Sequence, residues 1–90
     1  MINIFVSIEV SVDKKNQMLP LLEALTTASQ KENGCSRYQY WLHPTDPEKI
    51  AIVEQWMDAA SLEKHEATEH FNVLLPQIQA LANQLDIEKF

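Results

Sequence analysis

Residues 2–12 alternate strictly between apolar and mostly polar side chains, and no other segment constrains the fold as much. The even-numbered positions are all isoleucine or valine, and the odd-numbered ones are polar except for Phe5. A period of two in β-branched residues predicts a half-buried strand rather than a helix. The chain therefore needs a sheet with one face against a core, and the polar face could line a wet pocket or meet solvent.

Apolar residues at helical spacing follow this strand. The carboxylate of Asp13 is placed to cap the helix, because it can accept hydrogen bonds from the first free backbone N–H groups. Pro20 costs about 3 kcal/mol inside a helix, so we expect either an irregular first turn or a regular helix that begins near Leu19. Asn33 and Gly34 end the helix, since glycine adopts a positive φ freely. The stripe at helical spacing consists of Met18, Leu22, Leu25 and Ser29, with Leu21 and Ala28 beside it.

Two further strands are predicted over residues 35–43 and 49–57, where aromatic and β-branched side chains alternate with others. The segment Pro44-Thr45-Asp46-Pro47 between them has the composition of a turn, and its prolines remove backbone donors where a strand ladder should stop. The two strands are therefore expected to form a hairpin.

The rest of the chain predicts two helical segments and a short last strand. Asp58 is expected to cap a helix over residues 59–66, and a second helical segment opens at Thr68 and runs to about residue 84. Pro76 lies within this segment and predicts a kink or a late start. Residues 85–90 alternate weakly, as in a short strand.

The predicted order of elements is strand, helix, strand, strand, helix, strand. This order is that of an α+β, ferredoxin-like βαββαβ plait, an antiparallel sheet with the helices on one face. The uncovered face carries large apolar residues such as Trp41 and Val53, which is more than soluble monomers expose. We therefore expect a homodimer in which two sheets pack against each other.

Length and composition exclude several classes of protein. Ninety residues suffice for one domain, 1–90, and a net charge of −6 with seven basic residues disfavours nucleic acid as a partner. Cys35 is the only cysteine, which excludes an internal disulfide and a cysteine-based zinc site. No apolar run approaches the ~20 residues of a membrane span, and residues 1–12 lack the basic start of a signal peptide. We expect a cytoplasmic protein without a membrane partner.

His65 and His70 are the residues best suited to proton transfer, because imidazole titrates near neutral pH. They are five residues apart across the junction of two helical segments, and the sequence offers no obvious third ligand, so no metal site is expected. His65 has two readings, a partly buried residue bonded to backbone or a proton shuttle beside a substrate. The single glycine leaves no glycine-rich loop, so no nucleotide cofactor is expected.

Trp56 and Glu54 share one face near the end of the third predicted strand, just before the helix that carries His65. Trp56 is either core or the wall of a pocket. Tyr38 and Tyr40 are expected to be structural, as aromatic residues in strands usually are. These residues predict a largely apolar cleft between sheet and helices that suits a small, flat, hydrophobic molecule.

Four motifs in order, spanning nearly the whole chain, resemble the antibiotic biosynthesis monooxygenase (ABM) domain family. Members of this family are dimeric ferredoxin-like proteins of the dimeric α/β-barrel type, which agrees with the plait and the dimer expected above. The motifs are Glu32-Asn33-Gly34-Cys35-Ser36-Arg37-Tyr38, then Pro44-x-Asp46-Pro47, then Glu54-Gln55-Trp56, and His65-x-x-Thr68-x-His70-Phe71.

The resemblance implies where a substrate lies and which chemistry is at hand. It puts His65 and Trp56 near the substrate cavity, with His70 and Phe71 at its border. Family activities include cofactor-independent oxidation of anthrones or quinols by dioxygen, haem degradation, and isomerisation of a phosphorylated sugar derivative. Haem is not expected here, because Leu75 stands where the haem-degrading branch has its iron-ligating histidine.

The leading hypothesis is a cofactor-independent monooxygenase that oxidises a small aromatic or quinol-like substrate with dioxygen. In this hypothesis His65 accepts a phenolic proton, Trp56 and Phe71 hold the ring, and His70 orients or polarises. Of the residues that anthrone-oxidising members use, only the tryptophan, at Trp56, has a counterpart here. The alternatives are a non-catalytic dimeric module that binds a metabolite or serves a stress response, and an isomerase in which His65 and His70 shuttle protons.

Overall fold

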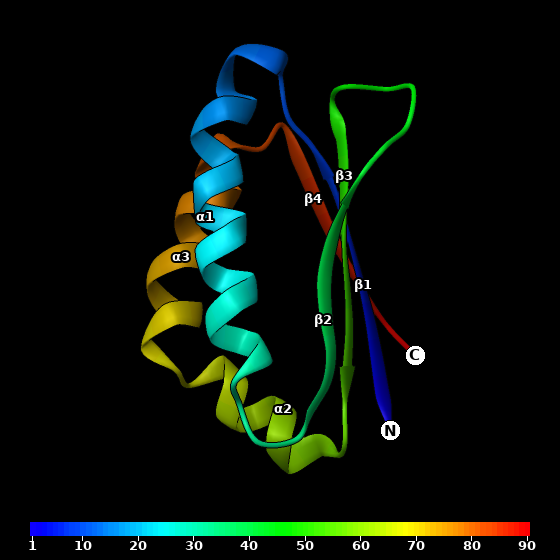
Figure 1. The fold of residues 1–90 in the computed structure, drawn as a ribbon, viewed down its shortest axis with the longest axis vertical. Helices are drawn as coiled ribbons and strands as arrows, with labels where there is room; N and C mark the ends of the chain where they lie inside the picture. Colours follow the sequence, from blue (N-terminus) through cyan, green and yellow to red (C-terminus); the bar gives the residue numbers. More distant parts are fainter.

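The computed structural model describes residues 1–90 as one antiparallel sheet covered on one face by helices (Figure 1). The strand order is β2-β3-β1-β4, and every neighbouring pair is antiparallel. The predicted ferredoxin-like plait is confirmed, and its second helical region is divided into two helices. The elements are β1 (Ile2–Glu9), α1 (Val12–Gln30), β2 (Cys35–Leu42), β3 (Lys49–Trp56), α2 (Ala59–Glu66), α3 (Glu69–Leu81) and β4 (Gln84–Lys89).

The alternation of the first strand places Ile4, Val6 and Ile8 on the helix-covered face, where all three are buried. The strand ends at Glu9, so the predicted extension to residue 12 is wrong. Val10 is still fully buried, which explains why the apolar pattern continues beyond the last residue of the strand. The chain leaves the strand after Glu9 and enters α1 at Val12.

Ser11 occupies the N-cap position of α1, so the predicted cap at Asp13 is wrong. The Ser11 carbonyl accepts from the backbone N–H groups of Lys14 and Lys15, which starts the helix one residue before Asp13. Asp13 lies in the first turn, where its negative charge favours the positive end of the helix dipole.

Helix α1 also runs through Pro20 from Val12, so the expected late start or irregular first turn is wrong. Pro20 and Asn16 are both exposed, and water can therefore satisfy the carbonyl that proline leaves without a donor. The same holds in α3, which begins at Glu69 with Pro76 exposed in its interior.

The predicted cap at Asp58 and the predicted opening of the last helix at Thr68 are confirmed. The Asp58 carboxylate accepts from the Ser61 backbone N–H at 2.8 Å, and the Thr68 hydroxyl accepts from the Phe71 N–H at 3.2 Å. Gly34 has φ +85°, as expected for the residue that reverses the chain after α1, and its carbonyl accepts from Met57 N–H at 2.7 Å. This bond ties the end of α1 to the end of β3.

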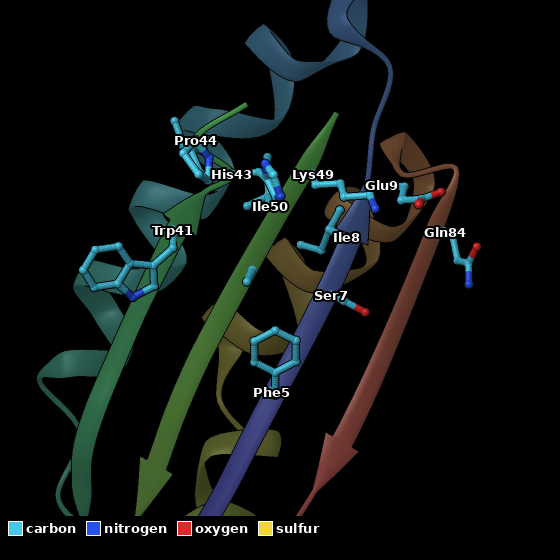
Figure 2. Close-up of a pocket in the computed structure, with 12 residues that line it drawn as sticks. Phe5, Ser7, Ile8, Glu9, Trp41, His43, Pro44, Lys49, Ile50 and Gln84 are labelled. Carbon is cyan, nitrogen blue, oxygen red and sulfur yellow. The ribbon is translucent and has the colours of Figure 1, made fainter. Parts of the chain in front are cut away.

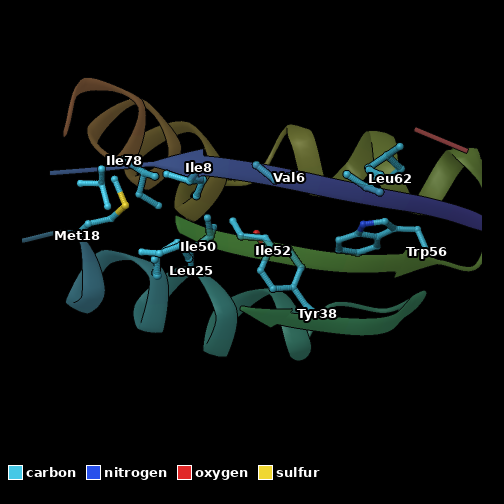
Figure 3. Packing of buried hydrophobic residues seen from close by; sticks show 13 residues of the cluster. Val6, Ile8, Met18, Leu25, Tyr38, Ile50, Ile52, Trp56, Leu62 and Ile78 are labelled. Atoms are coloured by element: carbon cyan, nitrogen blue, oxygen red, sulfur yellow. The ribbon is translucent and has the colours of Figure 1, made fainter. Parts of the chain in front are cut away.

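The hydrophobic core lies between the sheet and the helices (Figure 3). It joins α1 to the two central strands at one end and reaches Trp56 and Leu62 at the other. None of the three helices combines the length and the hydropathy that a membrane span requires. The core residues are Ile4, Val6, Ile8, Val10, Met18, Leu22, Leu25, Tyr38, Ile50, Ile52, Trp56, Leu62 and Ile78.

Candidate active site

A cavity of about 190 Å³ lies between the sheet and the helices, at the end of the core where α2 and α3 meet. Nine of its thirteen lining residues are hydrophobic, contributed by all four strands and all three helices. Its charged and titratable side chains are Tyr38, Glu54, His65, Glu66 and Lys89. The cavity predicted from the sequence is therefore present, and it carries more carboxyl groups than the sequence led us to expect.

His65 lies on α2 with only 2% of its surface exposed, and its ring is held on one side by Glu32. The distance from His65 Nδ1 to Glu32 Oε2 is 2.7 Å, and His70 Nε2 lies 2.8 Å from the same oxygen. A carboxylate oxygen can only accept, so each imidazole donates an N–H to it. Nδ1 of His65 therefore carries a hydrogen, and in the neutral ring Nε2 is left as the free acceptor.

The free Nε2 of His65 faces the carboxyl group of Glu54, with 4.0 Å between Nε2 and Oε1. Glu54 comes from β3 and is only 6% exposed. Its Oε1 accepts a hydrogen bond of 3.0 Å from the indole Nε1–H of Trp56. Burial raises the pKa of Glu54 to about 7, against the lowering effect of the Trp56 hydrogen bond.

Two of the four residues predicted for the site line the cavity, and two do not. His65 and Phe71 are lining residues, with ring centroids 5.1 Å apart in an edge-to-face arrangement. Trp56 is fully buried against the other side of His65, at a centroid distance of 4.3 Å. His70 touches the cluster through Glu32 and remains partly exposed. All four are thus brought together around the His65 imidazole.

Glu32, His65 and His70 form the one group in the chain whose donor atoms could hold a metal ion, all within 4.8 Å of one another. Such a set of two imidazoles and a carboxylate suits a transition metal. The same contacts supply Oε2 of Glu32 with two N–H donors. Neither Glu32 nor His70 lines the cavity, so an ion held by them would lie outside it.

A larger hollow of about 440 Å³ lies on the opposite, uncovered face of the sheet (Figure 2). Phe5 and Trp41 stand on this face, and Lys49 and Glu9 lie near one end of the hollow. None of the predicted site residues contributes to it. This surface is open, whereas the smaller cavity encloses a buried imidazole and a buried carboxyl, so we take the smaller one as the candidate active site.

Sequence analysis did not assign Glu32 or Glu54 to the candidate site. Glu32 is 33 residues from His65, and only the turn at Gly34 brings the end of α1 beside α2. For Glu54, the strand pattern in the sequence contains a feature that could have identified it. It follows Ile50 and Ile52 on the face that alternation assigns to the core, where a carboxyl group is out of place unless it has a function or a partner.

Comparison with known proteins places the chain among others of the same architecture. A family model described as antibiotic biosynthesis monooxygenase matches residues 1–75. A solved structure from Bacteroides thetaiotaomicron, described as a conserved protein of unknown function and possible oxidoreductase, is 32% identical, with 99% of this chain and 94% of that chain covered and a TM-score of 0.94. No curated protein matches.

Two further solved structures have the same fold over nearly their whole length. One is described as an antibiotic biosynthesis monooxygenase and is 28% identical, with 100% of this chain and 96% of that chain covered and a TM-score of 0.93. The other, a conserved protein from Methanosarcina mazei Go1, is 24% identical, with 99% of this chain and 89% of that chain covered and a TM-score of 0.93.

Proposed function

This chain belongs to the antibiotic biosynthesis monooxygenase family, and from that premise we propose that it oxidises a small aromatic, quinol-like substrate with dioxygen without a cofactor. The observation that carries the proposal is a buried imidazole, that of His65, at the wall of an otherwise largely apolar cavity. A fixed base in a dry cavity is the arrangement that activation of a phenol requires.

His65 is the proposed base. Glu32 accepts from Nδ1–H and so leaves Nε2 to take the phenolic proton of the substrate. The resulting phenolate is electron-rich and transfers one electron to dioxygen, and the two radicals combine at a ring carbon. For a hydroquinone the overall reaction is hydroquinone plus dioxygen to hydroxyquinone plus water, in which the substrate supplies all four electrons.

The other predicted residues act around this base. Phe71 forms an aromatic wall of the cavity against which the substrate ring can pack. We assign Trp56 and His70 positioning roles, because Trp56 packs against His65 and donates to Glu54, while His70 shares the Glu32 oxygen.

The size of the cavity favours a substrate with a single ring. A dry cavity of about 150 Å³ in another protein accommodates benzene, and the cavity here measures about 190 Å³. A monocyclic hydroquinone fits this space, whereas a three-ring anthrone would need the walls to move apart. We therefore propose methylhydroquinone as the first probe.

The uncovered face of the sheet supports the proposal that the active form is a homodimer. Trp41 is 59% exposed there and Phe5 is 36% exposed. Pairing two copies face to face would remove both from water, and Trp41→Glu should then convert the dimer to monomers in sedimentation velocity. A wild-type protein that sediments as a monomer at all concentrations would contradict the dimer.

The test of the function is oxygen consumption with methylhydroquinone, corrected for its spontaneous oxidation. We expect His65→Asn to lower the enzymatic rate by about 10²-fold or more, the usual contribution of a general base. The matched control is His43→Asn, because His43 is exposed in the β2–β3 loop, does not line the cavity, and uses its Nδ1 only for contacts with Thr45 and Asp46 of the same loop. An unchanged rate in His65→Asn with the fold intact would refute the mechanism, binding without turnover would favour the non-catalytic module, and turnover without oxygen would favour an isomerase.

A further inference from the structure

We propose that Glu54 is a second catalytic residue of this site, the acid that protonates the departing oxygen when the O–O bond of the substrate peroxide breaks. The inference rests on the proposed function and adds to it the fate of the second oxygen atom. It gives a role to the buried carboxyl group of the cavity, because the proposed action of His65 as a base does not involve this group.

Glu54 is held in a fixed position on the floor of the cavity. It is the central residue of three adjacent strands, paired with Ile4 of β1 on one side and with Tyr38 of β2 on the other. Its Oε1 is tied to Trp56 Nε1–H at 3.0 Å, while no side chain or backbone group donates to its Oε2. One oxygen is thus anchored and the other is left for a molecule in the cavity.

The groups around Glu54 favour its protonated form. Glu66 on α2 and Glu32 in the turn after α1 are negative neighbours that disfavour a negative charge on Glu54. Lys89 of β4 is the one ammonium group that counteracts them, and its Nζ lies 3.8 Å from Glu66 Oε2. Desolvation is the largest effect, and the pKa of Glu54 rises to about 7, so much of the population carries a proton at neutral pH.

Monooxygenation needs such an acid after the substrate has combined with oxygen. At that point a new C–O bond joins the ring to a hydroperoxide, and His65, which has passed the phenolic proton to that peroxide, is neutral again. His65 then removes the hydrogen of the same ring carbon, and its C–H electron pair becomes the C=O bond. The O–O electron pair leaves with the distal oxygen as hydroxide, which takes the proton of Glu54 and becomes water.

The positions of His65 and Glu54 also allow both residues to regain their starting protonation states. After this step His65 is an imidazolium and Glu54 is a carboxylate, with 4.0 Å between Nε2 and Oε1, and the water just formed can carry the proton from Nε2 to the free Oε2 of Glu54. Without the Glu54 proton, hydroxide is a poor leaving group and the C–O bond breaks instead. The hydroperoxide then departs as hydrogen peroxide, and the hydroquinone ends as the unhydroxylated quinone.

The test measures how oxygen is divided between the two products in the full-length protein with methylhydroquinone. We expect wild type to form mainly hydroxyquinone, and Glu54→Gln to consume oxygen while releasing most of it as hydrogen peroxide, because losing a general acid slows its step by about 10²-fold or more. Glu54→Asp, which retains a carboxyl, should fall between the two. In wild type the peroxide fraction should rise as pH passes 7.

The control is Glu63→Gln, an exposed carboxyl on α2 that does not line the cavity and should leave the product ratio unchanged. Unaltered hydroxyquinone formation in Glu54→Gln would overturn the inference and leave the proposed function intact. Loss of all oxygen uptake in that variant would also overturn it, because Glu54 would then act before the O–O bond breaks. If wild type consumes no oxygen, the proposed function fails first and the inference fails with it. If Glu54→Gln does not fold, the product ratio of Glu54→Asp and the pH series of wild type decide the question.

Discussion

Replacement of Glu54 by glutamine should change the pH dependence of stability, whatever the substrate of the protein is. Glutamine has the same shape, can still accept from Trp56 Nε1–H, and does not titrate. Glu54 is 6% exposed, and its pKa rises from 4.5 to about 7 in the folded protein. The folded state therefore binds this proton more tightly than the unfolded state does.

The sign and size of the effect follow from that difference in pKa. A carboxyl whose pKa is raised by folding stabilises the folded state while it is protonated, and that contribution is lost as pH rises from the unfolded pKa through the folded one. With pKa values of 4.5 and about 7, wild type should lose about 2 to 3 kcal/mol relative to Glu54→Gln between pH 5 and pH 8. This is a large fraction of the stability of a small domain.

Urea unfolding at pH 5 and pH 8, followed by tryptophan fluorescence, measures the effect. Carboxyl groups remote from Glu54 contribute equally to both proteins, so the difference between the two proteins reports Glu54 together with its coupling to Glu32 and Glu66. With an m-value of about 1 kcal/mol/M, the urea midpoint of Glu54→Gln should rise by about 2 to 3 M relative to that of wild type between the two pH values. A difference between the two proteins that stays constant with pH would refute the claim that Glu54 is a buried acid titrating near neutrality.

Two further substitutions test the turn and the cavity. Gly34→Ala should lower the free energy of unfolding by about 1 to 3 kcal/mol, because φ is +85° and an added Cβ would overlap the Ser61 side chain. Thermal unfolding measures this loss, and an equal loss in Ser36→Ala, at an exposed position, would contradict the reasoning. Leu75→Phe should raise KM for methylhydroquinone about tenfold by filling the cavity, whereas Val73→Phe, on the exposed side of α3, should leave KM unchanged. Equal KM values for the two variants in steady-state kinetics would show that the substrate binds elsewhere.

The fold could be predicted from local sequence patterns, and the prediction for α1 failed where the effect of a proline depends on its exposure to solvent. Alternation in the strands and the caps at Asp58 and Thr68 fixed the order of the elements, because each depends on residues within a few positions of one another. The predicted irregular first turn or late start of α1 is wrong, because Pro20 is exposed and water can replace the missing hydrogen bond. Sequence shows that a proline is present but not which side of the helix faces water.

The site was less predictable, because its essential contacts join residues that are far apart in the chain. His65 could be recognised by its chemistry, but its tautomer is set by Glu32, which lies 33 positions earlier and on the other side of the hairpin. Glu32 is also the third potential metal ligand beside His65 and His70, which the sequence alone did not reveal. Only the tertiary structure shows that the turn at Gly34 directs the end of α1 toward α2.

Glu54 connects the stability of the fold to the proposed chemistry. The desolvation that would make this carboxyl a proton donor at neutral pH is the same desolvation that destabilises the folded protein once the proton is lost. An apolar residue at this position, flanked by Ile4 and Tyr38, would remove that cost and would extend the core without interruption. A carboxyl retained at the centre of the sheet, with one oxygen anchored by Trp56 and the other free, is therefore better explained by a reaction in the cavity than by the needs of folding.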